Sequence, residues 1–202
     1  MRVLMRLALR LGLLVCLGAL SACASTRLID SEVRSFRSGT PDLAAASYQF
    51  DRLPSQQADP VAQAQKETWA IPVLQRLGLT ISSQAPRYTV QLSVGSEQVQ
   101  RNEPIFMRRW RFSPGDPALA LPFMRLSLEP MLYRFQVQVL VRDAISREVV
   151  YEASGQHTGP WSDQANILPA VLLAAMRDFP QGSSGPSLVK VEIGPGGMEL
   201  RP

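Results

Sequence analysis

Alternation of polar and apolar residues over positions 133–142, interrupted only at Leu140, is the feature that most constrains the fold of this chain. Every second residue from Tyr133 to Val141 is apolar, and arginines and glutamines occupy most of the positions between them. Successive side chains of a β-strand point to opposite faces, so the pattern predicts a strand with one buried face and one solvated face. Half-buried strands of this kind are typical of antiparallel sheets.

Further strands are expected on both sides of this segment. Residues 143–146 are suited to a turn and residues 149–153 to a strand, which predicts a β-hairpin. Alternating runs predict strands at residues 47–53 and 88–94, and residues 188–193 are expected to form a short edge strand.

A first helix is expected to begin at Asp59 and Pro60. The carboxylate can cap free backbone amides, and proline suits the first helical position. The helix should run through Trp69 and be kinked or interrupted at Pro72, which lacks an amide hydrogen. A second short helical stretch should then stop at Gly78, where glycine suits a left-handed cap.

A second amphipathic helix is expected over residues 166–179, with Asn166 as its cap, Pro169 in its first turn and Pro180 as its stop. An apolar stripe follows one side of this helix: Leu168, Val171, Leu172, Ala175 and Phe179. Helices and half-buried strands together predict an α+β fold. We expect a two-layer sandwich whose mostly antiparallel sheet carries two helices on one face.

The amino-terminal segment has the layout of a secretory signal. Arg2, Arg6 and Arg10 precede an uncharged, mostly apolar run over residues 11–26. A bilayer-spanning helix needs about 20 apolar residues, so this run is too short to span and suits a cleaved signal peptide instead.

The end of this run resembles the lipobox of bacterial lipoproteins, in the order Leu20-Ser21-Ala22-Cys23. That resemblance implies cleavage after residue 22 and lipidation of Cys23 with several acyl chains, which gives stable anchoring. Ala24 follows the cysteine, so the outer membrane is the expected destination, on its periplasmic face. A simple secretory signal cut beside Ala22 or Ala24 and a buried helix with an incidental cysteine are the alternatives.

Cleavage would change the charge of the chain. The whole sequence has a formal net charge of +4, but the signal contains three of its arginines and no acidic residue. The mature chain would be nearly neutral, which argues against a nucleic-acid partner. Its only cysteine would be the lipidated Cys23, so no internal disulfide is expected.

The mature chain is expected to be organised in three parts. Residues 23–45 would form the lipidated cysteine with a tether or first strand, and residues 46–193 a single α+β domain with a Pro-rich insertion near 102–130. Residues 194–202 would be a flexible Gly/Pro-rich tail.

The order of these elements resembles the DUF4136 family of envelope lipoproteins. The matching segments are Ser47-Tyr48-Gln49-Phe50, Leu77-Gly78-Leu79, residues 139–151 and Phe179-Pro180. Residues 102–130 depart from the pattern. The resemblance implies the fold and an envelope location, and it supplies no catalytic residues because the family has no established activity.

Residues suited to chemistry are few. His157 could serve as a general base, but nothing in the sequence specifies a partner for it, and a surface or loop-packing histidine is the simpler interpretation. Asp116, Glu129, Asp143 and Asp163 have no spacing that pairs two of them on one face. We therefore expect no catalytic residues, no cofactor and no metal.

One segment combines arginines with aromatic residues: Arg101, Arg108, Arg109, Trp110 and Arg111. Arginines beside aromatic rings can clamp phosphates of lipid headgroups or bind another polyanionic partner. A solvated strand with packed aromatic residues explains the same pattern.

The function that we expect is therefore a non-enzymatic binding or accessory module of the bacterial envelope, held by a lipid at Cys23. Its partner would be an envelope protein or a glycolipid. A carrier of a lipid or other apolar ligand, held between sheet and helices, is the alternative, and an envelope hydrolase using His157 comes third.

Overall fold

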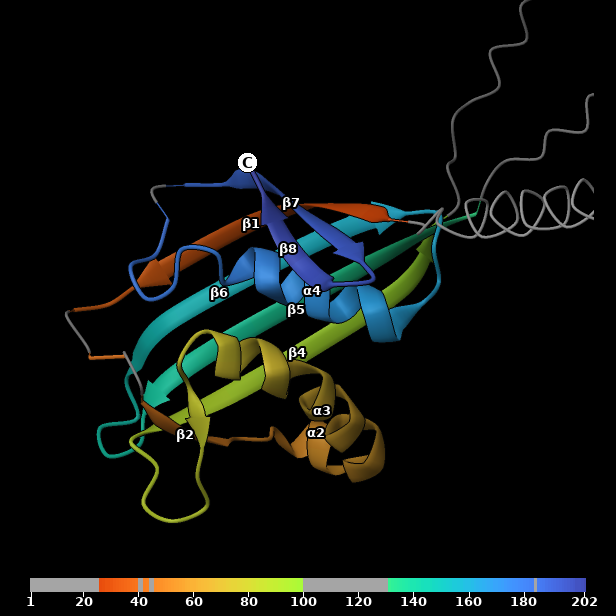
Figure 1. Cartoon of the computed structure of the whole chain (residues 1–202). Helices are drawn as coiled ribbons and strands as arrows, with labels where there is room; N and C mark the ends of the chain where they lie inside the picture. The colour runs from red at the N-terminus through yellow and green to blue at the C-terminus, as the bar shows by residue number, and fades with distance from the viewer. Residues whose placement is uncertain (1–25, 40–41, 44–45, 100–130, 184) are drawn as a thin grey trace, which may run out of the picture.

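The computed structural model describes residues 26–39, 42–43, 46–99, 131–183 and 185–202, and their strands form one mixed eight-stranded sheet (Figure 1). The order of the strands is β3-β2-β4-β5-β6-β1-β7-β8. Their bounds are β1 Arg27–Arg37, β2 Ser47–Phe50, β3 Thr80–Ile81, β4 Tyr88–Val99, β5 Leu132–Asp143, β6 Val149–Gly159, β7 Ser187–Gly194 and β8 Gly197–Arg201. The helices are α2 (Pro54–Gln57), α3 (Pro60–Arg76) and α4 (Gln164–Ala175). The α+β class is confirmed.

Pairing within the sheet is mostly antiparallel. Only β2 pairs in parallel, with β3 and with β4. The expected hairpin of β5 and β6 is present, and the Asp143 carboxylate closes its turn by accepting hydrogen bonds from the amides of Ile145 and Ser146, both at 2.9 Å. Strand β6 continues to Gly159, beyond the residues expected for it.

Helix α3 begins as expected but is not interrupted. The Asp59 carboxylate accepts a hydrogen bond from the amide of Ala62 at 3.0 Å, and the chain leaves the helix through Gly78 at a φ of 87°. The expected interruption at Pro72 is wrong, since one helix runs from Pro60 to Arg76 with the proline inside it. Buried residues lie on both sides of the proline, and their packing offsets one missing hydrogen bond.

Helix α4 begins two residues earlier than expected and ends earlier. Its cap position is Asp163, and the Asn166 side chain donates a hydrogen bond to the Asp163 carboxylate at 2.6 Å instead of capping the helix. Pro169 therefore lies inside the helix. The helix contacts β1, β5, β6 and β7 and is buried on almost all sides. Its burial is therefore more extensive than the single apolar stripe predicts.

The carboxyl-terminal segment also differs from expectation. Strand β7 is not an edge, because it pairs with β1 on one side and β8 on the other. Residues 194–202 are not a flexible tail: Gly197, at a φ of 107°, closes a hairpin that returns as β8. The Arg76 guanidinium at the end of α3 donates a hydrogen bond to the Met198 carbonyl at 2.6 Å, which ties β8 to a helix distant in sequence.

The two faces of the central strands differ sharply. On one face Val33, Phe135, Val137 and Ala153 are buried at 3% exposure or less. Gly155 lies on the same face, where a Cβ would approach the Ala175 Cβ of α4 to 3.1 Å, so glycine permits the helix to pack closely. The opposite face of these strands is polar.

In the part of the chain that is described, none of the helices is both long and apolar enough to cross a bilayer. The expected signal peptide over residues 1–22 and the Pro-rich insertion near residues 102–130 lie outside the described residues.

Candidate functional site

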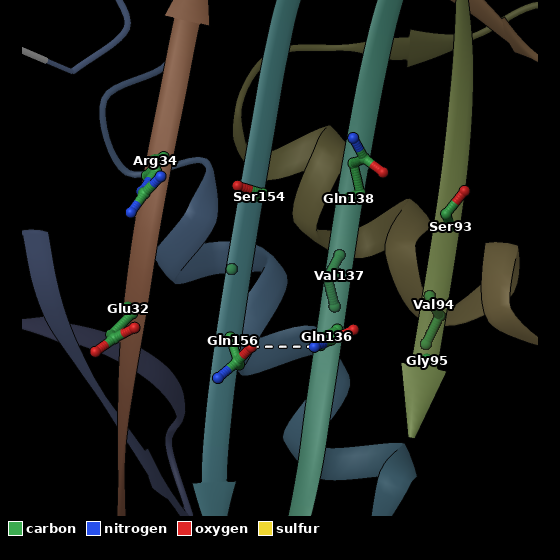
Figure 2. Close-up of a pocket in the computed structure, with 11 residues that line it drawn as sticks. Glu32, Arg34, Ser93, Val94, Gly95, Gln136, Val137, Gln138, Ser154 and Gln156 are labelled. Atoms are coloured by element: carbon green, nitrogen blue, oxygen red, sulfur yellow. Dashed lines mark hydrogen bonds between the residues drawn. The ribbon is translucent and has the colours of Figure 1, made fainter. Parts of the chain in front are cut away.

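A polar hollow of about 590 Å³ crosses four strands on the open face of the sheet (Figure 2). Its polar side chains come from β1, β6, β5 and β4: Glu32, Arg34, Ser154, Gln156, Gln136, Gln138 and Ser93. The volume is within the range of ligand sites, roughly 300–1,000 Å³. We take this hollow as the candidate functional site.

The register of the strands arranges these side chains in two rows. Read from β1 to β4, the first row consists of Arg34, Ser154, Gln138 and Ser93, each directly opposite the next. In the second row the order is Glu32, Gln156, Gln136 and Gly95. Small residues at Ser93, Gly95 and Ser154 leave space above the sheet, so the hollow follows directly from residue size along two rows.

Charge in the hollow is confined to one side of it. Glu32 and Arg34 are both exposed on β1 and form no hydrogen bond or ion pair with any described residue. One row beyond the hollow, the Arg134 guanidinium by contrast lies 2.6 Å from the Glu97 carboxylate. The site therefore presents one cation and one anion that pair with none of the described residues, beside neutral amides.

The chemistry of the hollow suits binding. Each glutamine side chain has hydrogen-bond donors and an acceptor, and each serine hydroxyl can both donate and accept a hydrogen bond. The Gln136 amide donates a hydrogen bond to the Gln156 carbonyl oxygen at 3.0 Å, and Gln138 donates one to Glu152 at 3.3 Å. Among the described residues no three His, Cys, Asp or Glu side chains gather in a metal-binding group.

His157 is neither on the surface nor in a loop, which corrects that expectation. It lies in β6 with 2% of its surface exposed, on the buried face. Its Nδ1 lies 2.7 Å from the Asp30 carbonyl oxygen, which can only accept, so Nδ1 carries the proton. The ring stacks on Trp161 with a centroid separation of 6.5 Å, and no described residue forms a hydrogen bond with its Nε2. No substrate can reach a ring packed in this way, so its geometry does not favour a general base.

Space between the helices and the sheet is small. The void between α3, α4, β4 and β5 holds about 10 Å³ and is bordered by Trp69, Leu92 and Leu172. That is no more than the space for one water molecule. This part of the described structure has no room for an acyl chain.

A partly buried ionic network joins α3 to the segment that follows β2. The Glu67 carboxylate, whose residue is 6% exposed, accepts hydrogen bonds from the Arg52 guanidinium at 2.7 and 2.5 Å and from the Gln63 amide at 3.3 Å. Burial and the nearby Glu67 charge raise the pKa of Tyr48 to about 12. The Tyr48 hydroxyl is buried and has no hydrogen-bond partner among the described residues.

Most of the residues singled out from the sequence lie outside the part of the chain that the structure describes. Cys23, Arg101, Arg108, Arg109, Trp110 and Arg111 all lie outside the described residues. The sequence pattern does not mark the residues of the hollow as a site. Their signal was the polar half of each alternating strand, but that half is equally suited to plain solvation.

Comparisons with known proteins assign no family. No protein-family model matches the sequence, and no curated protein matches it. Two solved structures of PelC dodecamers from Paraburkholderia phytofirmans are 17% identical and cover 72% of this chain, with TM-scores of 0.43 and 0.42 and coverage of 94% and 95% of the PelC chain. A PDZ domain protein from Parabacteroides distasonis is 10% identical over 84% of this chain, with a TM-score of 0.46, and only 39% of that protein is covered. At these TM-scores neither a fold family nor a function follows, and the resemblance to the DUF4136 family stays a prediction.

Proposed function

We propose that this protein is a non-enzymatic binding module of the bacterial envelope, anchored by lipid at Cys23 to the periplasmic face of the outer membrane. The polar hollow is the observation that carries the binding role. It combines amides and hydroxyls with two charged side chains, Glu32 and Arg34, that pair with none of the described residues. The order of charges, apolar run, small residues and cysteine in the first 23 residues supports the anchor.

We also propose the finer fold description, a two-layer sandwich with α3 and α4 on the same face of the sheet. The burial of alternate residues in β5 and β6 supports it, as do the contacts of α4 with β1, β5, β6 and β7 and of α3 with β4 and α4.

Photo-crosslinking in intact cells tests the binding role. A photoreactive residue replaces Ser154 in the hollow, and a matched one replaces Ile145, which is 94% exposed in the β5–β6 turn. We expect a distinct crosslinked product from position 154 that Glu32→Ala with Arg34→Ala removes. Identical products from both positions, or no effect of the two substitutions, would show that the hollow is not the binding site.

The anchor is tested separately with Cys23→Ala. The substitution should abolish incorporation of labelled palmitate and release the chain from outer-membrane fractions, because no thiol remains to accept the lipid. A variant that is still labelled and still sediments with outer membranes contradicts the proposal.

The carrier of an apolar ligand is the alternative function. The small void between the helices and the sheet does not favour it. Mass spectrometry of extracts from protein purified without detergent should detect no lipid bound inside the domain; a stoichiometric lipid would support the carrier instead.

An anionic partner for Arg101, Arg108, Arg109 and Arg111, with Trp110 between them, is proposed on the local excess of arginine alone. Replacing Arg108, Arg109 and Arg111 with serine should weaken binding of the chain to anionic vesicles at low salt. Unchanged vesicle binding would refute this contact.

A further inference from the structure

The geometry points to a defined orientation on the membrane: the end of the sheet at which β1 begins faces the lipid headgroups, and the polar hollow stands above them. This inference rests on the proposed lipidation of Cys23. It adds the surface of the domain that meets the bilayer and the height of the binding site.

The first step is the length of the tether. Only Ala24, Ser25 and Thr26 separate Cys23 from Arg27, the first residue of β1. The four residue steps from Cys23 to Arg27 span at most about 14 Å when the chain is fully extended. Strand β1 is an interior strand, paired with β6 on one side and with β7 on the other, so it cannot detach to lengthen the tether without breaking the sheet.

The second step is which parts of the sheet share that end. Arg27 pairs with Ile193 beside the turn from β7 to β8. Strand β6 ends at Gly159, which lies opposite Tyr133 near the start of β5. In Figure 1 the start of β1, the end of β6 and the end of β4 lie together toward the right. The β5–β6 turn, with Ile145, lies at the opposite end.

The third step is the chemistry of that end. The charges described there are paired, since Arg27 lies 3.3 Å from the Asp163 carboxylate and Arg134 lies 2.6 Å from Glu97. Leu28 and Met131 expose apolar side chains nearby, at 47% and 61%. Paired charges with a few exposed apolar side chains suit a surface close to the headgroup layer, because little charge has to be desolvated there.

The height of the hollow follows from the strand. Glu32 and Arg34 lie five and seven residues along β1 from Arg27, or roughly 17 and 23 Å at about 3.3 Å per residue. The hollow therefore opens sideways into the periplasm, and the short tether keeps it near the membrane. A partner bound there would be one that reaches close to the bilayer surface.

Quenching by a headgroup-labelled lipid tests the orientation. The full chain is produced with its signal, purified in lipidated form and reconstituted in phosphatidylcholine vesicles that contain a lipid with a nitroxide headgroup. Two single-cysteine variants, Met131→Cys and Ile145→Cys, carry a thiol-reactive fluorophore. The label is specific, because Cys16 is removed with the signal and the Cys23 sulfur is blocked by its lipid. We expect severalfold stronger quenching at position 131 than at position 145.

A tether control identifies the cause. A flexible insert of about 40 Gly/Ser residues after Ser25 spans roughly 35 Å and should abolish the difference between the two labels while the protein stays on the vesicles. A persistent difference with the insert, or equal or reversed quenching without it, would overturn the orientation. A chain that carries no acyl group and does not stay on vesicles would refute the anchor itself, and with it this inference. Cys23→Ser protein should show no quenching at either position.

Discussion

The side-chain amide of Gln136 on β5 donates a hydrogen bond to the side-chain oxygen of Gln156 on β6, with 3.0 Å between the two atoms. The two residues lie directly opposite each other across the strands, at the centre of the open polar face (Figure 2). Exposed cross-strand pairs stabilise a sheet only weakly, so this pair is better suited to meeting a ligand than to holding the fold together.

Replacing both glutamines should separate binding from stability. Gln136→Ala with Gln156→Ala should change the free energy of unfolding by less than about 1 kcal/mol, because both side chains face solvent. The same protein should lose the crosslinked product formed from position 154. Urea unfolding and crosslinking in cells measure the two effects.

The neighbouring residue provides the matched control. Val137 is 3% exposed on the opposite face, and Val137→Ala should cost about 2 kcal/mol or more by leaving a cavity. If the glutamine variant is as unstable as the valine variant, the amide pair is structural and the proposed division of the two faces is wrong.

Tyr48→Phe should stabilise the protein and change its response to alkaline pH. The buried Tyr48 hydroxyl has no hydrogen-bond partner in the described part of the chain, so its removal relieves an unsatisfied polar group. The pKa of Tyr48 is about 12 in the folded chain and about 10 when unfolded, so only the unfolded state ionises between these values and stability falls as the pH rises through that window. The loss should reach roughly 2 to 3 kcal/mol in the native chain and be smaller in the variant.

Urea titrations at pH 9 and above measure this difference. Tyr151, whose pKa is also raised by burial, leaves part of the alkaline loss in place. Tyr88→Phe is the control, because the Tyr88 hydroxyl donates a hydrogen bond to the Asp42 carbonyl at 3.1 Å and its removal should destabilise the protein at neutral pH. Equal effects of the two substitutions would contradict the assignment.

Gly159→Ala should destabilise the fold through His157. A Cβ at position 159 would lie 2.6 Å from the His157 Nε2, and the ring is confined by Trp161 and by its bond to the Asp30 carbonyl. We expect a cost of about 2 kcal/mol for the crowding. In a His157→Ala background the same substitution should cost much less, so a double-mutant cycle by urea unfolding should give a clear coupling energy. Additive effects would mean that the ring is free to move aside.

Glu67→Ala should lower the free energy of unfolding by about 2 kcal/mol, because the Gln63 amide and the Arg52 guanidinium lose their common acceptor at a buried position. Glu148→Ala, at an exposed site, should stay within about 0.5 kcal/mol of the native chain. Chemical denaturation compares the two. A small effect at Glu67 would indicate that water replaces the carboxylate in the network.

Structural features that depend only on residues adjacent in the sequence could be predicted well from the sequence. The alternation of β5, the turn at Asp143 and the ends of α3 at Asp59 and Gly78 all agree with the structure. Their physical cause is local, since side-chain direction, turn geometry and capping each depend on a few adjacent residues.

Predictions at Pro72 and the carboxyl terminus failed for a different reason. Helix α3 continues through Pro72 because the helix is packed on both sides of it, and β8 is ordered by pairing with β7 and by the hydrogen bond from Arg76. At both places a tertiary contact outweighs a local preference, and the sequence pattern does not contain that contact. The Asn166 prediction failed locally, because the helix starts two residues earlier and the Asn166 amide bonds the Asp163 carboxylate.

The sequence by itself therefore determined which side chains of β5 face the core and which face water, because that choice follows the two-residue period of a strand. Only the tertiary structure decided that Gln136 and Gln138 line the same hollow as Glu32 and Arg34. These residues are about a hundred positions apart, and the register that brings them into two rows is set by pairing through β6. A polar residue on the open face is solvated equally well in any register. The polar half of the alternating pattern therefore does not predict which residues lie opposite it on neighbouring strands.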